Sequence, residues 1–239
     1  MIIGVISAMA KEHAQLTNLL REARTERDGA TEFTIGSLGD NRLVLMQCGI
    51  GKVNAAVGAT LLIRRYAPDC VVSTGCAGGL AEGLNVMDVV VSTETAYHDV
   101  NIPGCDPGQV QGLPARFRSE EMAVETALTT LSTKPSTIHA GLIVSGDQFI
   151  SDTTQMQHIR ALFPEALAVD MESAAIAQTC HLMQVPFVSF RVLSDTPGAD
   201  EHLQQYLNFW DSMAERSFDI IRRFLTALPS RFATLPFEN

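Results

Sequence analysis

The stretch AVDMESAAIAQTCHLMQVPFVSFRVLSD, residues 168–195, contains two carboxylates that each follow an apolar run. The first run, Ala166–Val169, precedes Glu172, and the second run, Phe187–Leu193, precedes Asp195. Apolar runs of this length, rich in Val and Phe, predict buried strands of a parallel sheet. Because ligands bind beyond the carboxyl ends of such strands, we expect both carboxylates to line a binding site.

The second apolar run also contains a cation, Arg191. A guanidinium buried in a strand needs a carboxylate partner, because an unpaired buried charge is costly. Glu172 is the partner that we expect. Plainer interpretations exist for the carboxylates themselves, since Glu172 could simply begin a helix and Asp195 could cap a helix that follows Pro197.

Strand-like and helix-like segments alternate along the whole chain, which predicts one α/β domain over residues 1–239. The expected strands are Ile2–Ser7, Leu43–Cys48, Cys70–Thr74, Val86–Ser92, Gly141–Ser145, Ala166–Val169 and Phe187–Leu193. The expected helices are Lys11–Arg21, Val53–Tyr66, Glu120–Leu131, Thr153–Leu162, Glu172–Met183 and Glu201–Leu225. Such alternation predicts a mostly parallel sheet covered on both faces, with Pro103–Pro114 as its one long loop.

The composition narrows the class of protein. A formal net charge of −10 argues against nucleic-acid binding, which needs Lys and Arg to neutralise phosphates, and against an anionic membrane surface. The N-terminal sequence MIIGVISAMAKE has no basic region before its short apolar run, so we interpret it as a strand rather than a signal peptide. An odd number of cysteines without CxxC spacing favours reduced thiols in the cytoplasm. These cysteines are Cys48, Cys70, Cys76, Cys105 and Cys180.

Three further segments follow predicted strands and are expected at the same end of the sheet. Met9 and Glu12 follow the first strand, a glycine turn at 75–79 follows the third, and Phe149 lies in the GDQFI segment 146–150. Each signal is weak alone, because Glu12 could be a solvated residue of a first helical turn, the glycines a tight connection and Phe149 core packing. Their shared position is what predicts one pocket.

These residues resemble the methylthioadenosine/S-adenosylhomocysteine nucleosidases of the nucleoside phosphorylase/hydrolase superfamily. The resemblance covers nearly the whole chain, and its most specific motifs are Met171-Glu172 and Ser194-Asp195. It implies a three-layer α/β/α sandwich around a mixed central sheet, and a cytoplasmic homodimer with no metal and no organic cofactor. The motifs that carry it are Ala8-Met9…Glu12, residues 73–79, Tyr97-His98-Asp99, Val144-Ser145-Gly146-Asp147…Phe149-Ile150, Asp170-Met171-Glu172 and Arg191…Ser194-Asp195.

The resemblance also implies roles for individual residues. Asp195 would be the general acid that protonates N7 of the purine, and Glu12 would orient and deprotonate the attacking water. Glu172, steadied by Arg191, would accept hydrogen bonds from the ribose hydroxyls, while Phe149 would stack on adenine. The remaining residues expected to bind substrate are Met9, Ile50, Cys76, Ala77, Gly78, Ile150, Met171 and Ser194.

The expected function is hydrolysis of the N-glycosidic bond of 5′-substituted adenine nucleosides (methylthioadenosine, S-adenosylhomocysteine, 5′-deoxyadenosine), which releases adenine. Water is favoured over phosphate as the nucleophile, because the segment SAMAKE places Glu12 there with only Lys11 as a cation. Three alternatives stay open: a nucleosidase for a futalosine-type substrate, a purine nucleoside phosphorylase of the same fold, and an inactive nucleoside-binding module.

Two positions depart from the family pattern. Position 76 is Cys where the family typically has Ser, and a thiol is a poorer hydrogen-bonding group than a hydroxyl. The segment 100–108 has two prolines and no aromatic residue, whereas the family usually has an aromatic there that lines the partner subunit's 5′ pocket. We therefore expect partner residues near Ile102 to line that pocket, with adenine and ribose recognition intact and the 5′ side altered.

Overall fold

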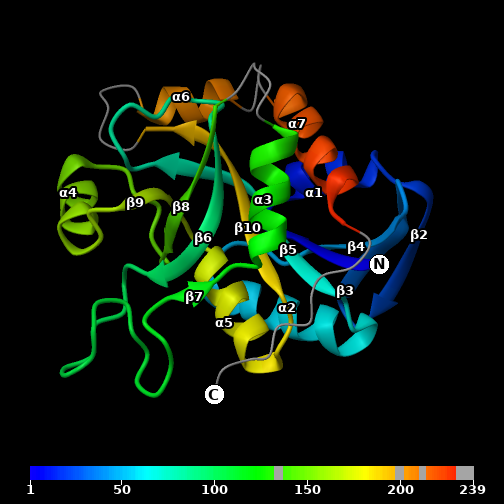
Figure 1. Cartoon of the computed structure of the whole chain (residues 1–239), viewed down its shortest axis with the longest axis horizontal. Coiled ribbons are helices and arrows are strands. Elements are labelled where there is room, and N and C mark those ends of the chain that lie inside the picture. Colours follow the sequence, from blue (N-terminus) through cyan, green and yellow to red (C-terminus); the bar gives the residue numbers. More distant parts are fainter. Residues whose placement is uncertain (132–136, 197–201, 210–213, 230–239) are drawn as a thin grey trace.

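The computed structural model describes residues 1–131, 137–196, 202–209 and 214–229, and its strands form one mixed sheet (Figure 1). The sheet order is β10-β6-β8-β9-β5-β1-β4-β3-β2, with the short β7 paired to β6. The strands are β1 (Ile2–Ser7), β2 (Arg21–Asp28), β3 (Thr31–Leu38), β4 (Asn41–Gln47), β5 (Cys70–Gly79), β6 (Val89–Tyr97), β7 (Phe117–Arg118), β8 (Ile138–Ser145), β9 (Ala166–Asp170) and β10 (Phe187–Asp195).

Helices cover both faces of the sheet, so the three-layer α/β architecture is confirmed (Figure 1). Side chains of α1, α3 and α7 pack in one apolar cluster on one face, and those of α2 and α5 pack in a second cluster on the other. The helices are α1 (Ala10–Thr17), α2 (Lys52–Tyr66), α3 (Glu121–Thr130), α4 (Thr153–Leu162), α5 (Ser173–Met183), α6 (His202–Asn208) and α7 (Ala214–Ala227).

The alternation of strand residues explains the two clusters. Ile3 and Val5 of β1 belong to the cluster of α1, α3 and α7, whereas Ile6 belongs to the cluster of α2 and α5. Successive side chains of a strand point to opposite faces, and here both faces are apolar. This is why the strands appear in the sequence as continuous apolar runs.

Five strands close into a ring, because β10 pairs with β5 as well as with β6. Going round, the order is β5, β9, β8, β6 and β10, and each strand contributes a buried side chain to one small cluster. These side chains are Ala77, Ile143, Ala168, Val90 and Leu193. The interior of a ring this small is filled by side chains, so it is a packed core rather than a channel.

A gap in the sheet lies beside the ring. Strand β1 pairs with β5 up to Ser73, and β9 pairs with β5 from Gly78 onward. Between these points β10 is the only strand paired with β5 in the described part of the chain. Because β1 runs parallel to β5 and β9 runs antiparallel to it, the carboxyl ends of β1 and β9 face each other across this gap. The residues that follow both strands therefore meet at one place.

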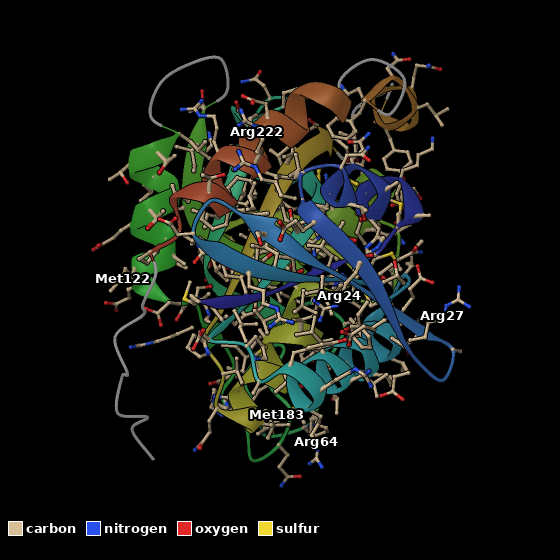
Figure 2. The ribbon with its side chains drawn as sticks, turned by 90° about the vertical axis from the view of Figure 1, so that its right-hand side faces the viewer. Arg24, Arg27, Arg64, Met122, Met183 and Arg222 are labelled. Carbon is tan, nitrogen blue, oxygen red and sulfur yellow. The ribbon has the colours of Figure 1, made fainter. Side chains whose placement is uncertain are left out.

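The structure corrects several expected elements. The expected helix Lys11–Arg21 ends at Thr17, and Arg21 begins β2, which forms an antiparallel hairpin with β3 that the sequence analysis missed. Strand β2 reads REARTERD, and its side chains are mostly exposed at the edge of the sheet. Figure 2 shows Arg24 and Arg27 projecting from this edge. Charged side chains on an edge strand discourage pairing with other chains, and they also hide the strand from an analysis of apolar patterns.

The expected glycine turn at 75–79 is also wrong. These residues continue strand β5, which pairs with β10 through Gly78 and with β9 at Gly78 and Gly79. Strand β6 begins at Val89 and runs to Tyr97, later than expected. The expected loop 103–114 is present and contains neither helix nor strand.

The C-terminal part differs as well. The single helix expected over Glu201–Leu225 is two helices, α6 and α7, and Glu201 and residues 210–213 lie outside the described residues. Pro197 and the helix cap considered for Asp195 also lie outside them. No helix in the described ranges is long and apolar enough to span a bilayer.

Helix α7 is tied to the sheet by a stacked aromatic pair, which gives a test of the fold. Phe190 of β10 and Phe224 of α7 stack with ring centroids 4.6 Å apart, and both are fully buried. Phe190→Ala is expected to lower the free energy of unfolding by about 3–5 kcal/mol, measured by urea denaturation, because it leaves a cavity. Phe149→Ala, at a side chain that is 48% exposed, is the matched control and should cost far less. Equal losses in the two variants would contradict this packing.

Candidate active site

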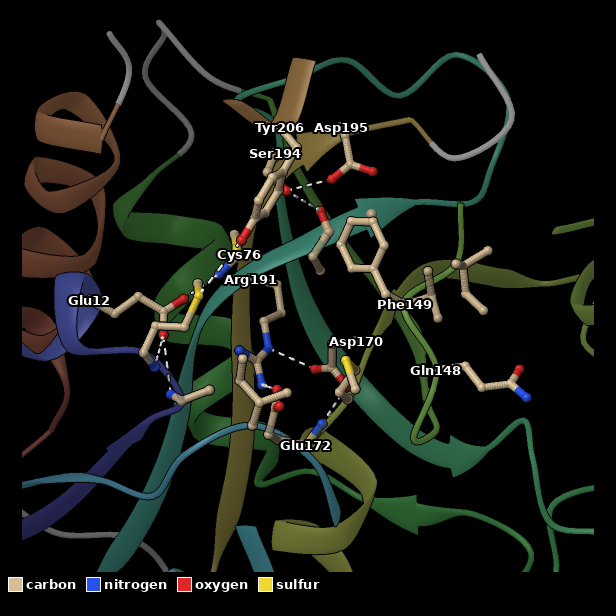
Figure 3. A pocket seen from close by; sticks show the side chains of 18 residues that line it. Glu12, Cys76, Gln148, Phe149, Asp170, Glu172, Arg191, Ser194, Asp195 and Tyr206 are labelled. Carbon is tan, nitrogen blue, oxygen red and sulfur yellow. Dashed lines mark hydrogen bonds and ion pairs between the residues drawn. The ribbon is translucent and has the colours of Figure 1, made fainter. Parts of the chain in front are cut away.

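A cavity opens at the gap between β1 and β9 and holds about 660 Å³ of empty space, including its open mouth (Figure 3). Every site residue expected from the sequence lines it. They are Met9, Glu12, Ile50, Cys76, Ala77, Gly78, Phe149, Ile150, Met171, Glu172, Arg191, Ser194 and Asp195. The lining also includes residues that were not predicted as site residues, namely Ala8, Gln148, Val169, Asp170 and Tyr206.

Glu12 is buried at the start of α1 and is held by three backbone donors. The N–H groups of Ala8 and Met9 donate to Oε2 at 3.1 and 3.0 Å, and the N–H of Cys76 donates to Oε1 at 3.1 Å. In the described part of the chain β10 is the only strand paired with β5 at this point, and the Cys76 N–H donates to Glu12 rather than to a strand on the side of the gap. Burial raises the pKa of Glu12 even though these donors and Arg191 oppose the shift.

Gly75 permits Glu12 and Arg191 to approach strand β5 closely. A Cβ at this position would lie 2.5 Å from Glu12 Oε1 and 2.6 Å from Arg191 Nη1, which is closer than real side chains come. Neither neighbour can move away cheaply, because the carboxylate and the guanidinium are both held by hydrogen bonds. The absence of a side chain at Gly75, which lies within strand β5, is therefore a requirement of the site.

Arg191 forms its main ion pair with Asp170 rather than with Glu172. Its Nε lies 2.8 Å from Asp170 Oδ2, and both side chains are only 2% exposed. The distance from Nη2 to Glu172 Oε2 is 3.9 Å, so the expected Glu172 pair is present but weaker. Asp170 is the last residue of β9, and both it and Arg191 line the cavity.

Hydroxyl groups complete the environment of this ion pair. Arg191 Nη2 donates to Ser73 at 2.8 Å and to Ser173 at 3.1 Å. Asp170 accepts from Ser145 at 2.5 Å and also from the hydroxyl of Ser173. A buried ion pair is stable only when its remaining donors and acceptors are satisfied, and serines from three elements, β5, β8 and α5, do this here.

Glu172 lies at the N-terminus of α5 and faces the cavity (Figure 3). Its Oε1 accepts from the Gly51 N–H at 2.9 Å. Burial raises the pKa of Glu172 to about 7, with Asp170 and Glu12 adding to the rise while Arg191 and Gly51 oppose it. The carboxylate of Glu172 thus has lone pairs left to accept hydrogen bonds from a ligand. Without a ligand it is poorly solvated.

Asp195 lies at the end of β10, apart from Glu12 and Glu172 in the cavity (Figure 3). It is 4% exposed, and its Oδ1 accepts from the Ser194 hydroxyl at 2.6 Å. Nearby, burial raises the pKa of the Cys76 thiol well above its usual value, so this thiol stays protonated. Cys76 therefore serves Glu12 through its backbone.

Aromatic and thioether groups form the outer part of the cavity. Phe149 is 48% exposed and makes an edge-to-face contact with Tyr206 of α6, with centroids 5.6 Å apart. The Tyr206 hydroxyl lies 3.7 Å from the sulfur of Met9. A side chain this exposed is not core packing, so that interpretation of Phe149 does not hold. An exposed ring beside a cavity can stack on a planar ligand.

Two contributors were missed by the sequence analysis for different reasons. Asp170 was visible in the Asp-Met-Glu motif, but the sequence does not tell which of its two carboxylates meets Arg191. Tyr206 had no signal, because it lies on a separate helix far along the chain. The arrangement as a whole provides four carboxylates in different surroundings around one space, one of them, Asp170, paired with Arg191. Within the described ranges, no cluster of three or more His, Cys, Asp and Glu is placed to hold a metal ion.

Known proteins resemble the chain over almost its full length. The family model of the phosphorylase superfamily matches residues 2–226. A 5′-methylthioadenosine/S-adenosylhomocysteine nucleosidase of Bacillus subtilis is 40% identical over 228 residues, which cover 94% of this chain and 98% of the relative.

Solved structures agree with this similarity. The Neisseria meningitidis nucleosidase of the same name, in complex with methylthio-immucillin-A, has a TM-score of 0.90 and 41% identity, covering 95% of this chain and 99% of its own. The Colwellia psychrerythraea enzyme, in complex with adenine, has a TM-score of 0.92 and 36% identity, covering 98% of both chains.

The buried carboxylate of Glu172 gives a pH-dependent test. A pKa of about 7 in the folded state, above the usual 4.5, means that the folded state binds the proton more tightly than the unfolded state. Stability therefore falls as the pH rises from about 4.5 to about 7. Glu172→Gln mimics the protonated form, so its Tm should exceed that of the unchanged protein by roughly 3–6 °C at pH 8 and match it near pH 5.

The measurement is a thermal melt of both proteins at several pH values. Glu94→Gln, at a side chain that is 31% exposed, controls for the general effect of removing a negative charge. A Tm difference for Glu172→Gln that stays constant between pH 5 and pH 8 would argue against the buried, poorly solvated carboxylate.

Proposed function

Because the chain belongs to the 5′-methylthioadenosine/S-adenosylhomocysteine nucleosidase family of the phosphorylase superfamily, we propose that it hydrolyses the N-glycosidic bond of 5′-substituted adenine nucleosides. The products are adenine and the free 5′-substituted ribose. The observation that carries this proposal is the convergence of Glu12, Glu172 and Asp195 on one cavity at the gap between β1 and β9.

Glu12 activates the attacking water in this proposal. Its raised pKa makes the ionised carboxylate a stronger base than an exposed one. Three backbone donors keep its oxygens in place, and Oε1, which accepts only from the Cys76 N–H, retains a lone pair that can accept a hydrogen bond from water. The water oxygen attacks C1′ of the ribose while Glu12 takes its proton.

Asp195 acts as the general acid. As the C1′–N9 bond breaks, its electron pair passes to the purine, and Asp195 donates a proton to N7. The Ser194 hydroxyl bonded to Oδ1 fixes the orientation of the carboxyl group. One water is consumed: Glu12 gains a proton from that water, Asp195 loses its proton to N7, and proton exchange with solvent restores both groups. Placing the two groups on different sides of the cavity follows the logic of inverting glycoside hydrolysis.

Glu172 and the apolar residues hold the substrate. Glu172 accepts hydrogen bonds from the ribose hydroxyls, and a bound ribose replaces the solvation that burial removes. Met9 and Met171 contact the sugar, Phe149 stacks on adenine, and the backbone of Ile150 binds the edge of the base. Contacts of this kind stabilise the charge that develops on the sugar in the transition state.

The charges around the site of the nucleophile favour water over phosphate as the attacking group. A carboxylate at Glu12 repels a phosphate dianion, and Arg191 is already committed to Asp170. A phosphorylase needs cations or free backbone donors for phosphate, whereas the donors here already bind Glu12.

The wider setting proposed for the enzyme is a cytoplasmic homodimer. Partner residues near Ile102 would complete the 5′ side of the cavity, next to Ile50, which is 54% exposed at its mouth. Because segment 100–108 lacks an aromatic residue, the 5′ side is where we expect substrate recognition to be altered.

The nucleophile is tested by measuring adenine release from methylthioadenosine with and without inorganic phosphate. Hydrolysis predicts the same rate in both conditions, with free methylthioribose as the second product. A rate that depends on phosphate, with a sugar 1-phosphate as product, would instead establish a phosphorylase.

The same assay addresses the substrate. Values of kcat/KM are compared for methylthioadenosine, S-adenosylhomocysteine, 5′-deoxyadenosine and adenosine. Turnover that tolerates different 5′ groups is the expected outcome, and a strong preference for the methylthio group would argue against an altered 5′ side. A chain that binds adenine but turns over none of these four would point to a futalosine-type substrate or an inactive binding module.

The acid role of Asp195 has its own test. Asp195→Asn is expected to lower kcat by about 10³-fold or more, because it removes the proton donor, while adenine binding by calorimetry changes little. Ser194→Ala is the comparison variant, and it should lower kcat much less because the carboxyl group remains. Substantial activity in Asp195→Asn would remove Asp195 from the acid role.

A further inference from the structure

Three charged side chains lie next to the cavity without lining it: Lys52, Asp99 and Asp147. They come from the start of α2, the loop after β6 and the loop after β8, so three distant parts of the chain meet here. We call them the 52–99–147 cluster. The mechanism proposed above does not use them.

The cluster is connected by short polar contacts that centre on one oxygen. Lys52 Nζ donates to Asp99 Oδ2 at 2.7 Å, and the Asp147 N–H donates to the same oxygen at 2.9 Å. Lys52 Nζ also lies 3.8 Å from Asp147 Oδ2 and 5.4 Å from the centre of the Tyr97 ring. The side chains of Lys52 and Asp99 are 24% and 15% exposed, so this contact is partly shielded from water.

Burial alone would raise the pKa of Asp99. The Lys52 ammonium and the Asp147 N–H outweigh that effect, and the pKa of Asp99 is lowered. Asp99 is therefore ionised, and its oxygen is a charge-assisted acceptor for both donors.

The cluster continues directly into the N-terminus of α2, where two backbone donors bind two carboxylates. The Gly51 N–H donates to Glu172 Oε1 at 2.9 Å, and the Lys52 N–H donates to Asp147 Oδ1 at 2.8 Å. Gly51 has φ +94°, and a Cβ there would lie 2.9 Å from Asp147 Oδ1. This glycine thus lets one helix end hold a site carboxylate and a loop carboxylate side by side.

Both neighbours of this helix end belong to the cavity wall. Ile50 precedes Gly51, and the segment Gln148–Ile150 follows Asp147 directly. Asp147, directly before the segment that contains Phe149, is therefore bound to the N-terminus of α2, both by its own side chain and through Asp99. The same helix N-terminus binds Glu172.

We infer that Asp99 and Lys52 are positioning residues that set the spacing between the ribose-binding carboxylate of Glu172 and the purine-binding segment 148–150. They act through Asp147 and the α2 N-terminus without touching substrate. The inference rests on the proposed function for the identity of the ligand. If the cluster is lost, segment 148–150 is no longer held in position relative to Glu172, while Glu12 and Asp195 keep their places.

The test combines charge removal with a conservative replacement. Lys52→Met and Asp99→Asn should each raise the KM for methylthioadenosine and the Kd for adenine by about tenfold, while kcat falls less than about threefold. Lys52→Arg keeps the cation and should return both constants toward those of the unchanged protein. Partly exposed ion pairs contribute little to stability, so the Tm of each variant should stay within a few degrees.

The matched control is Glu94→Gln, which removes a carboxylate from a partly exposed pair, with Arg116, away from the cavity. It should leave KM and the adenine Kd unchanged. Three results would each overturn the inference: both constants within twofold of the unchanged protein in Lys52→Met and Asp99→Asn, equal changes in Glu94→Gln, or Lys52→Arg as impaired as Lys52→Met.

Adenine binding by calorimetry separates this inference from the proposed function. If the unchanged protein binds adenine but releases none from methylthioadenosine, the proposed function fails. The adenine dissociation constants of the variants still decide the role of the cluster.

Discussion

The buried ion pair between Arg191 and Asp170 is the contact on which the rest of the site depends. Both side chains are 2% exposed, so neither charge is solvated by water, and each needs the other. The pair joins β10 to the end of β9, at the place where the chain turns into α5 and presents Glu172. Removing either partner would leave a buried charge unpaired and would release the segment that carries Glu172. The serines around the pair make this costly arrangement tolerable, and they also fix its geometry.

The gap in the sheet explains why this pair, Glu12 and Glu172 share one cavity. Strands β1 and β9 stop on opposite sides of it, so the first residues of α1 and α5 face the same space. Strand β5 passes through the gap with no partner on that side among the described residues, and it supplies the Cys76 N–H to Glu12. Gly75 keeps this part of β5 bare, so that an anion and a cation can both approach it. The chemistry thus arises from an interruption of regular pairing.

The sequence was sufficient to predict the α/β architecture and that polar residues after several strands share one cavity, because buried strands leave continuous apolar runs and polar residues follow them, while most of the individual lining residues were expected from the family resemblance. It failed where structure depends on partners remote in the chain. Strand β2, with the sequence REARTERD, is a strand because β3 pairs with it, and its own residues carry no apolar pattern. Gly75–Gly79 resembles a turn, and only the neighbours β10 and β9 make it a strand. The choice between Asp170 and Glu172 as the partner of Arg191 depended on where β9 ends relative to β10, which no local pattern contains.

The small closed ring has a consequence for how such a protein can change. Its interior is filled by the buried side chains of Ala77, Ile143, Ala168, Val90 and Leu193. Larger residues at these positions would not fit and would push apart the strands that carry Asp170 and Asp195. Ile50, Phe149 and Tyr206 at the mouth are attached to loops and to α6 instead, outside that constraint. Changes in side-chain size are therefore tolerated better at the mouth of the cavity than inside the ring, so the shape of the mouth can change while the spacing of the ring strands stays the same.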